Sequence, residues 1–384
     1  MAVLEDLPPV PGKAVLVRAD LNVPLRPLPD GSSEVIDDFR IRAAVPTIAW
    51  LARAGAKVTV CSHLGRPKGR PDPRYAMAPV AARLGELIAA EVGDDLASGV
   101  SVMENLRFDP GETANDSSTV DRLVAGQDLY VNDAFGAAHR AHASVVGPPS
   151  RLPSAAGRVL AREVSVLVGV RDDPVRPLDV IIGGAKASGK LGVMTALVER
   201  AEVLMVGGGM CFTFLAALGH DIGDSLFEPD YLDACRALVD SGRRVMLPTD
   251  IVALGPGGEV GGTGGEVRVV GRDVPDGWKG LDIGPDTAAE FADELSGAGT
   301  VCWNGPMGVC EDPRFAAGTA TVARAVASCA GFTVVGGGDS AAALGELGLD
   351  GEVDHLSTGG GASLELLEKG DLPGLAALRV GVGV

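Results

Sequence analysis

The sequence predicts an α/β protein made of two doubly wound parallel-sheet domains joined by a hinge helix. Apolar runs that end in Gly, Asp or Asn alternate with Ala-rich stretches in which apolar residues recur at helical spacing. This alternation favours parallel strands connected by helices that cover both faces of a sheet. The pattern starts again after residue 170, and 384 residues are enough to bury two separate Rossmann-like cores.

The first half of the chain contains four apolar runs that predict strands. They are expected within 14–22, 56–65, 100–106 and 128–136. Between them, 42–55 and 78–93 carry apolar residues at helical spacing and predict helices.

The boundary between the two domains is expected near residue 168. Residues 154–170 (SAAGRVLAREVSVLVGV) predict one long amphipathic helix, and the charged, Pro-containing segment RDDPVRP follows it. We therefore expect an N-terminal domain at 1–168, with the hinge helix at about 154–168, and a C-terminal domain at 169–384. The last ~20 residues are a candidate for packing back on the N-terminal domain.

The second half repeats the strand pattern around Gly-rich ends. Strand-like runs lie within 177–186, 201–210, 243–254, 300–308 and 332–339. Residues 255–280 are expected to form an exposed Gly-rich turn or ribbon.

Composition excludes several classes of partner. The formal charge is −18, with 18 Lys+Arg against 20 Asp+Glu in 1–168, and 15 against 31 in 169–384. No basic footprint for nucleic acid is expected from this balance. Apolar runs stay shorter than the roughly 18 residues of a membrane helix, and the first residues lack a signal-peptide pattern. The six irregularly spaced cysteines favour reduced thiols and a cytoplasmic protein.

Ligands of doubly wound sheets bind at the carboxyl ends of the strands, and the two halves differ in what they place there. The first half has cations and polar groups: Arg18, Asp20, Asn22, His63, Arg66, Arg107, Asn132, Asp133, His139 and Arg140. The second has Gly clusters with Lys186, Lys190, Asp250, Asn304 and Asp339. The first edge suits a small bare anion, and the second suits an anion that arrives with its own divalent metal.

Two Gly-rich stretches admit more than one interpretation. GGAKASGKLG (183–192) fits the G-x-x-x-x-G-K pattern, but Leu191 cannot supply the Mg²⁺-binding hydroxyl of a Walker loop. A tight turn with both lysines solvated remains an alternative. GGGDSA (336–341) matches a dinucleotide fingerprint, yet no acidic residue ends a strand about 20 positions later. Several such clusters at strand ends nevertheless expose runs of backbone N–H groups that bind anions.

Ten segments in chain order resemble the signature sequences of the phosphoglycerate kinase family. They are VLVRADLNVPL, HLGRPKG, ENLRF, VNDAFGAAHRAHAS, GGAKASGK, VGGGMCFTFL, GLDIGPDT, WNGPMGVCE, VVGGGDSAAAL and STGGGASLELLE. The resemblance runs from Val15 to about Leu378. The chain departs from the family where it has Gly189 in place of the usual Asp, Ser340 in place of Thr and Cys310 in place of Phe.

The resemblance implies reversible transfer of the acyl phosphate of 1,3-bisphosphoglycerate to MgADP, giving 3-phosphoglycerate and ATP. It places the triose site in the first half, with these residues in contact with substrate: Asp20, Asn22, Arg40, His63, Arg66, Arg107 and Arg140. The residue types agree, because guanidinium groups match phosphate oxygens in a bidentate way. Arg40 is expected to face the transferring phosphoryl group.

The resemblance places the nucleotide in the second half. An adenine pocket is implied at Gly183, Gly184, Gly207, Gly208, Pro306 and Val309. Glu311 is implied to hold the ribose, Lys186 and Lys190 to reach the phosphates, and Asp339 to bind Mg²⁺. The phosphate path is expected along Asn304, Gly337, Gly338, Ser340, Gly360 and Gly361. Gly338 and Gly361 are expected to act in catalysis with Arg40, Lys186 and Lys190. Asp250 is expected either as a supporting residue or as a helix cap.

This chemistry needs no catalytic base, because the acceptor carboxylate has a pKa near ~4 and is ionised at neutral pH. The family also implies a monomer that closes about its hinge. Two other functions stay open: an NAD-dependent two-domain oxidoreductase, and a protein that binds a phosphorylated metabolite without turning it over.

Overall fold

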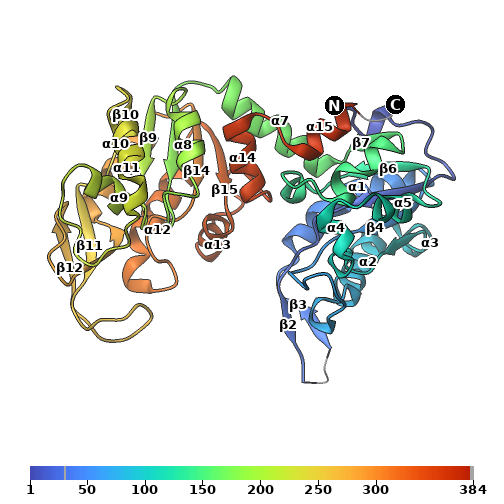
Figure 1. Cartoon of the computed structure of the whole chain (residues 1–384), viewed down its shortest axis with the longest axis horizontal. Helices are drawn as coiled ribbons and strands as arrows, with labels where there is room; N and C mark the ends of the chain where they lie inside the picture. The colour runs from blue at the N-terminus through green and yellow to red at the C-terminus, as the bar shows by residue number, and fades with distance from the viewer. Residues whose placement is uncertain (30–31, 381–384) are drawn as a thin grey trace. The chain divides into compact units, whose positions relative to one another are not determined.

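The computed structural model describes residues 1–29 and 32–380, which form two compact units. Among the described residues, the first unit is Met1–Ser165 together with residues 371–380, and the second is Val166–Gly370. The helix α7 (Arg158–Asp172) contains the boundary between them. Figure 1 shows the elements of both units, most of them labelled.

The first unit is built on a five-stranded parallel sheet in the order β5-β4-β1-β6-β7. Its strands are β1 (Ala14–Arg18), β4 (Lys57–Cys61), β5 (Val100–Val102), β6 (Leu129–Asn132) and β7 (Ser154–Ala156). A separate antiparallel hairpin joins β2 (Leu25–Pro27) to β3 (Ser33–Val35). The first four parallel strands lie within the predicted runs, but each ends earlier because the polar residues that follow belong to loops.

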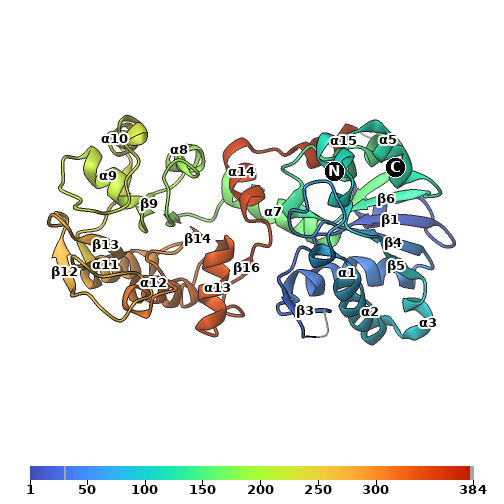
Figure 2. The same ribbon diagram turned by 60° about the horizontal axis from the view of Figure 1, so that its bottom comes forward.

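Helices cover both faces of this sheet, as the fold class predicts. They are α1 (Phe39–Arg53), α2 (Ala78–Val92), α3 (Asp94–Ala97), α4 (Pro110–Ala114), α5 (Ser117–Val124), α6 (Ala143–Val146) and α15 (Pro373–Val380). Figure 2 shows α1 and α2 on one face, and α5 and α15 on the other. Val15 and Val17 of β1 are buried in one core with Ile48 and Leu84, and burying each such side chain contributes about 2 kcal/mol.

The predicted start of the long helix is wrong. Residues 154–156 form the edge strand β7, which pairs with β6, and α7 begins at Arg158. The three small residues of β7 are fully buried against the neighbouring strand. The intervening Gly157 leaves room for Asp133, whose Oδ1 lies 2.1 Å from the position of a Gly157 Cβ. Asp133 accepts a 2.9 Å hydrogen bond from the Val159 amide and so caps the first turn of α7.

The second unit contains a six-stranded parallel sheet in the order β10-β9-β8-β14-β15-β16. Its strands are β8 (Leu178–Ile182), β9 (Val203–Val206), β10 (Arg244–Met246), β14 (Thr300–Asn304), β15 (Phe332–Gly336) and β16 (His355–Leu356). The order reverses between β8 and β14, which is the usual place for a ligand in a doubly wound sheet.

A smaller antiparallel sheet accounts for the rest of the strands in this unit. It has the order β12-β11-β13, from β11 (Asp250–Leu254), β12 (Val267–Gly271) and β13 (Lys279–Ile283). The apolar run within 243–254 is therefore two strands in two sheets, separated at Pro248, and not one. Most of β12 is exposed, in agreement with the exposed ribbon expected at 255–280.

Helices also lie on both faces of the six-stranded sheet. They are α8 (Leu191–Val198), α9 (Cys211–Ala217), α10 (Leu232–Val239), α11 (Pro285–Leu295), α12 (Ala317–Ala327), α13 (Gly338–Glu346) and α14 (Gly361–Lys369). Figure 2 shows α8, α9 and α10 on one side, and α11, α12 and α13 on the other. Asp250 accepts hydrogen bonds from the amides of Asp286 (3.1 Å) and Thr287 (2.8 Å) in the first turn of α11. Of the two roles expected for Asp250, the structure shows the helix cap.

Asp179, on β8, has a buried carboxyl group whose ionisation should affect the stability of the second unit. Its Oδ1 has no hydrogen-bond partner among the described residues. Burial, with the nearby carboxylates of Glu294 and Glu202, raises the pKa of Asp179 to about 6. A pKa that folding raises means that stability is lost as the pH rises from about 4 to about 6.

We expect Asp179→Asn to raise the free energy of unfolding at pH 8 by about 1 kcal/mol or more, and to have a smaller effect at pH 4. Urea unfolding at both pH values measures this. Asp121→Asn, at an exposed ion pair with Arg151, is the control and should change little. A variant less stable than the parent at pH 8 would contradict this account of the core.

Candidate active site

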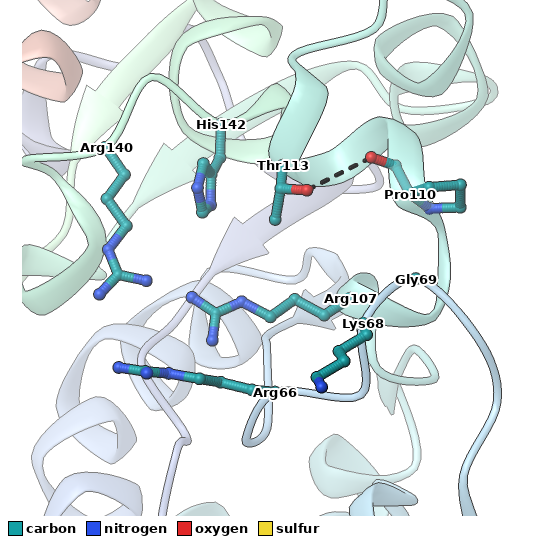
Figure 3. Close-up of a pocket in the computed structure, with 8 residues that line it drawn as sticks. All are labelled: Arg66, Lys68, Gly69, Arg107, Pro110, Thr113, Arg140 and His142. Carbon is teal, nitrogen blue, oxygen red and sulfur yellow. Dashed lines mark hydrogen bonds between the residues drawn. The ribbon is translucent and has the colours of Figure 1, made fainter.

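Cationic side chains surround a cavity of about 360 Å³ at the carboxyl edge of the first sheet (Figure 3). We call it the basic pocket and define it by its lining residues Arg66, Lys68, Gly69, Arg107, Pro110, Thr113, Arg140 and His142. In Figure 3 the guanidinium groups of Arg66, Arg107 and Arg140 approach one region from different segments. The structure thus brings together three of the predicted triose-site residues, which follow β4, β5 and β6.

Arg107 is held in a fixed position with part of its charge unmatched. It is 9% exposed, and its Nη1 donates a 2.7 Å hydrogen bond to the Gly65 carbonyl. Its Nε has no partner among the described residues. Burial, together with the positive charges of Arg140 and Arg18, lowers the pKa of Arg107 to about 10. An anion in the pocket would relieve this repulsion.

Asp20, Asn22 and Arg40 form a second group joined to the pocket through Gly65. Arg40 lies 3.5 Å from the Asp20 carboxylate and donates a 3.1 Å hydrogen bond to the Asn22 carbonyl. The Asn22 Oδ1 accepts a 2.8 Å hydrogen bond from the Gly65 amide. Gly65 therefore connects this group to Arg107.

His63 lies beneath this edge and does not supply the cation expected of it. Its Nδ1 is 3.0 Å from Nη2 of the buried Arg18. Burial and the charges of Arg18, Arg107, Arg140 and Arg40 place the pKa of His63 well below its usual range, so the ring is neutral at neutral pH. Sequence reasoning also assigned no site role to Lys68 and His142, which line the pocket. Lys68 lies in the segment HLGRPKG, but the sequence does not indicate its positive φ of 59°, which the conformation of the loop determines.

The predicted adenine-pocket glycines of the second unit are held in place by main-chain hydrogen bonds. The amide of Gly184 donates to the Pro306 carbonyl (2.8 Å), and that of Gly208 donates to the Met307 carbonyl (3.0 Å). A Cβ on Gly207 would lie 2.5 Å from the Met307 sulfur. Met307 was absent from the predicted set, because nothing in the sequence shows that its side chain turns towards these glycines.

Lys190 is folded back over the same turns. Its Nζ donates hydrogen bonds to the carbonyls of Gly183 (2.8 Å) and Asn304 (3.1 Å). Burial lowers the pKa of Lys190 to about 8, although the carboxylate of Asp339 opposes the shift. The alternative of two solvated lysines is thus wrong for Lys190, whereas Lys186 is exposed.

The next loops carry the remaining predicted nucleotide residues. Ser340 is buried, and its Oγ accepts a 2.7 Å hydrogen bond from the Gly305 amide. The side chain of Asn304 lies against Gly337. Gly338 and Gly361 begin α13 and α14, and Gly360 precedes α14 with a φ of 51°. Val309 is bonded to the Leu281 carbonyl of β13 (3.0 Å), and Glu311 beyond it is exposed.

The donor set at this edge fits a metal ion that arrives with its ligand. The exposed carboxylate of Asp339 lies in the first turn of α13. Within residues 1–29 and 32–380, no group of three or more His, Cys, Asp or Glu could hold a metal ion. One carboxylate is sufficient for a Mg²⁺ ion that keeps phosphate oxygens and water as its other ligands.

The chain has two doubly wound units. One carries a basic pocket, and the other carries glycine turns at its topological switch point. This combination is typical of enzymes that act on phosphorylated small molecules. Residues 4–370 match the family model for phosphoglycerate kinase. The chain is 53% identical to the phosphoglycerate kinase of Frankia alni over 99% of this chain and all of that protein. It is 52% identical to that of Salinispora arenicola over 96% of each.

Solved structures agree with this match. Phosphoglycerate kinase from Coxiella burnetii is similar with a TM-score of 0.85 and 34% identity over 98% of each chain. The enzyme from Pyrococcus horikoshii gives 0.82 and 30% over 99% and 98%. The chain belongs to the phosphoglycerate kinase family and is a phosphotransferase. Nothing in these comparisons supports an NAD-dependent oxidoreductase.

In the part of the chain that the structure describes, each helix is too short or too polar to span a membrane.

The packing of the glycine turns predicts a contrast between two substitutions. Gly208 has a φ of 66°, and its Cβ would lie 2.5 Å from the Gly184 nitrogen and 2.8 Å from the Pro306 oxygen. We expect Gly208→Ala to lower stability by about 2 kcal/mol or more and to raise the nucleotide KM at least tenfold. Thermal unfolding and steady-state kinetics measure both.

Gly189→Ala is the matched control. A Cβ there meets nothing within 4 Å, and no positive φ opposes it. This variant should keep the stability of the parent. Equal losses in the two variants would show that close main-chain packing is not the cause.

Proposed function

We propose that this protein transfers the acyl phosphate of 1,3-bisphosphoglycerate to MgADP, and catalyses the reverse reaction from 3-phosphoglycerate and MgATP. The basic pocket of the first unit is the observation that carries the proposal. Three guanidinium groups meet there with no carboxylate among the lining residues. The family match over residues 4–370 supports it.

The non-transferred phosphate of the triose binds in the basic pocket. Arg66, Arg107 and Arg140 donate to its oxygens, because planar guanidinium groups bind phosphate in a bidentate way. Asp20 and Asn22 bind the hydroxyl and carboxyl end of the substrate. Arg40, held by Asp20 at 3.5 Å, lies beside the carboxylate that accepts or releases the phosphoryl group.

The nucleotide binds at the carboxyl edge of the second sheet. The base lies against the turns of Gly183, Gly184, Gly207 and Gly208, where a side chain would prevent a flat ring from reaching the main chain. Pro306 and Val309 complete this pocket, and Glu311 binds the ribose. The amides that begin α13 and α14 face the phosphates.

The transfer itself requires neutralisation of charge rather than a base. The acceptor is a carboxylate that is already ionised at neutral pH. The loose transition state of phosphoryl transfer spreads negative charge over the equatorial oxygens. Arg40 and Lys190 supply positive charge to these oxygens, and the backbone amides of Gly338 and Gly361 donate to them. Lys190 must first leave the carbonyls of Gly183 and Asn304, and Lys186 reaches the nucleotide phosphates.

A Mg²⁺ ion bound with the nucleotide would neutralise phosphate charge, and Asp339 is the residue that would hold it. Since the triose and nucleotide residues belong to different units, transfer requires closure, and α7 is the proposed hinge. We further propose a monomer that acts in the cytoplasm. The described cysteines are all free thiols, as a reducing compartment favours.

One assay tests the function. ADP should form from ATP only when both Mg²⁺ and 3-phosphoglycerate are present. Binding of 3-phosphoglycerate without ADP formation would support a binding protein instead, and NAD reduction with a phosphorylated substrate would support an oxidoreductase. Either result would overturn the proposal.

Replacing the buried lysine tests the transfer step. We expect Lys190→Ala to lower kcat by about 100-fold or more, the scale of removing a preorganised charged group. Steady-state kinetics with saturating substrates measures it. Lys369→Ala, at an exposed ion pair with Glu365 in the same unit, is the control. Near-parental turnover in Lys190→Ala would remove this residue from the mechanism.

Replacing a pocket arginine tests the separation of the two sites. Arg140→Ala should raise the KM for 3-phosphoglycerate about tenfold or more, with the KM for ATP changed less than twofold. Arg151→Ala, at an exposed ion pair in the same unit, should change neither. Equal weakening for both substrates would contradict a separate triose site.

A further inference from the structure

We infer that His63 serves the triose site as a neutral hydrogen-bond donor through Nε2, and that buried Arg18 is the positioning residue that fixes this tautomer. The inference rests on the proposed function of the basic pocket and deepens it. The geometry that carries it is a chain of hydrogen bonds running from Glu112 through Ser144 and Arg18 to His63.

The first links of this chain begin at a carboxylate. Glu112 is 1% exposed and Ser144 is fully buried. The Ser144 hydroxyl donates a 2.7 Å hydrogen bond to Glu112 Oε1, and the Ser144 amide donates one of 2.9 Å to Oε2. The same hydroxyl oxygen accepts a 3.0 Å hydrogen bond from Arg18 Nε. Glu112 therefore compensates a buried guanidinium group through one serine.

Arg18 uses each of its nitrogens inside the protein. Nε donates to Ser144, Nη1 to the Ala19 carbonyl, and Nη2 lies 3.0 Å from His63 Nδ1. The side chain of Arg18 is 1% exposed, against 7% for His63. With its three nitrogens engaged inside the protein, Arg18 is placed to act on a bound anion through His63.

The chemistry of arginine fixes the proton of the imidazole ring. A guanidinium group only donates hydrogen bonds, so Nδ1 of His63 must accept one and carries no hydrogen. The ring proton of the neutral form is then on Nε2. Within the described part of the chain, Nε2 has no hydrogen-bond partner, and His63 is 7% exposed. Nε2 is thus the ring atom left to donate to an anion.

The charged groups around His63 also oppose a second proton on the ring. Arg18 on β1, Arg40 on α1, Arg107 after β5 and Arg140 after β6 all repel a charged imidazole. Glu112 of α4 is the carboxylate of this layer, and it is bonded to Ser144 and lies 3.7 Å from His142. His142 is neutral as well, since burial lowers its pKa to about 4.

Histidine NMR of the full-length protein tests the inference without any substitution at Arg18. Long-range ¹H–¹⁵N correlations, recorded from pH 5.5 to 8 and assigned with His63→Gln, should show the Nε2–H form of His63 throughout. Addition of 3-phosphoglycerate should shift the Nε2 resonance. A charged ring at pH 6.5, or a proton on Nδ1, would overturn the inference.

Arg18→Met then tests the positioning role, because it removes both the donor and the charge. The pKa of His63 should rise, because one of the positive charges that lower it is gone, and the KM for 3-phosphoglycerate should fall more steeply than in the parent between pH 8 and pH 5.5. Arg53→Met, at an exposed ion pair in the same unit, should leave the histidine spectrum unchanged. An unaltered His63 spectrum and pH profile in a folded Arg18→Met would refute the role of Arg18.

If Arg18→Met does not fold, Ser144→Ala breaks the chain of hydrogen bonds while keeping Arg18, and the parental spectrum still decides the tautomer.

The inference about His63 and the proposed function of the pocket fail separately. A wrong tautomer in an enzyme that phosphorylates 3-phosphoglycerate defeats this inference alone. ADP formation with the expected tautomer but without a shift on adding 3-phosphoglycerate also defeats this inference alone. The expected tautomer without 3-phosphoglycerate-dependent ADP formation defeats the proposed function of the pocket.

Discussion

The carboxyl ends of parallel strands meet at one edge of a sheet, where the last main-chain amides and carbonyls need new partners. The two units satisfy this requirement in different ways. In the first, side chains cover the edge: Asn22 and Arg107 bond to the two sides of Gly65. In the second, the turns bond to each other, as Gly184 does to Pro306 and Gly208 to Met307. Each solution leaves a different surface for a ligand.

Covering the first edge with side chains concentrates charge there. Arg18, Arg66, Arg107 and Arg140 lie near one another, and Glu112 is the carboxylate bonded into their buried layer. A buried charge without compensation is costly, so Arg18 requires Glu112 and Ser144. Arg107 is less fully compensated, as its lowered pKa indicates. The pocket is therefore preorganised for an anion before any substrate binds.

Much of this arrangement follows from local sequence, and the exceptions have physical causes. Asn22 and Arg107 were expected at the carboxyl edge because Asn22 closes the run 14–22 and Arg107 follows the run 100–106, although β1 ends at Arg18 and β5 at Val102. Strand β7 was missed because Ser154, Ala155 and Ala156 have low strand propensity and precede a helical pattern. The direction of Lys190, the place of Met307 and the neutral state of His63 depend on groups distant in sequence. Periodicity within one segment carries no information about such contacts.

Glycine turns can bind an anion through main-chain amides, and this mode of binding adds little positive charge to the second unit. Residues 169–384, most of which belong to this unit, hold 31 Asp+Glu against 15 Lys+Arg and so most of the chain's excess of acidic residues. Free backbone amides attract phosphate through partial charges, and they bind as well when a metal ion accompanies it. Lys190, a part-buried cation of this unit, is bonded to the carbonyls of Gly183 and Asn304. A guanidinium group keeps its charge at any physiological pH, so the arginines at the carboxyl edge of the first sheet are permanently charged. Burial lowers the pKa of Lys190 to about 8, so the positive charge at the edge of the second sheet depends on the surroundings of this amine.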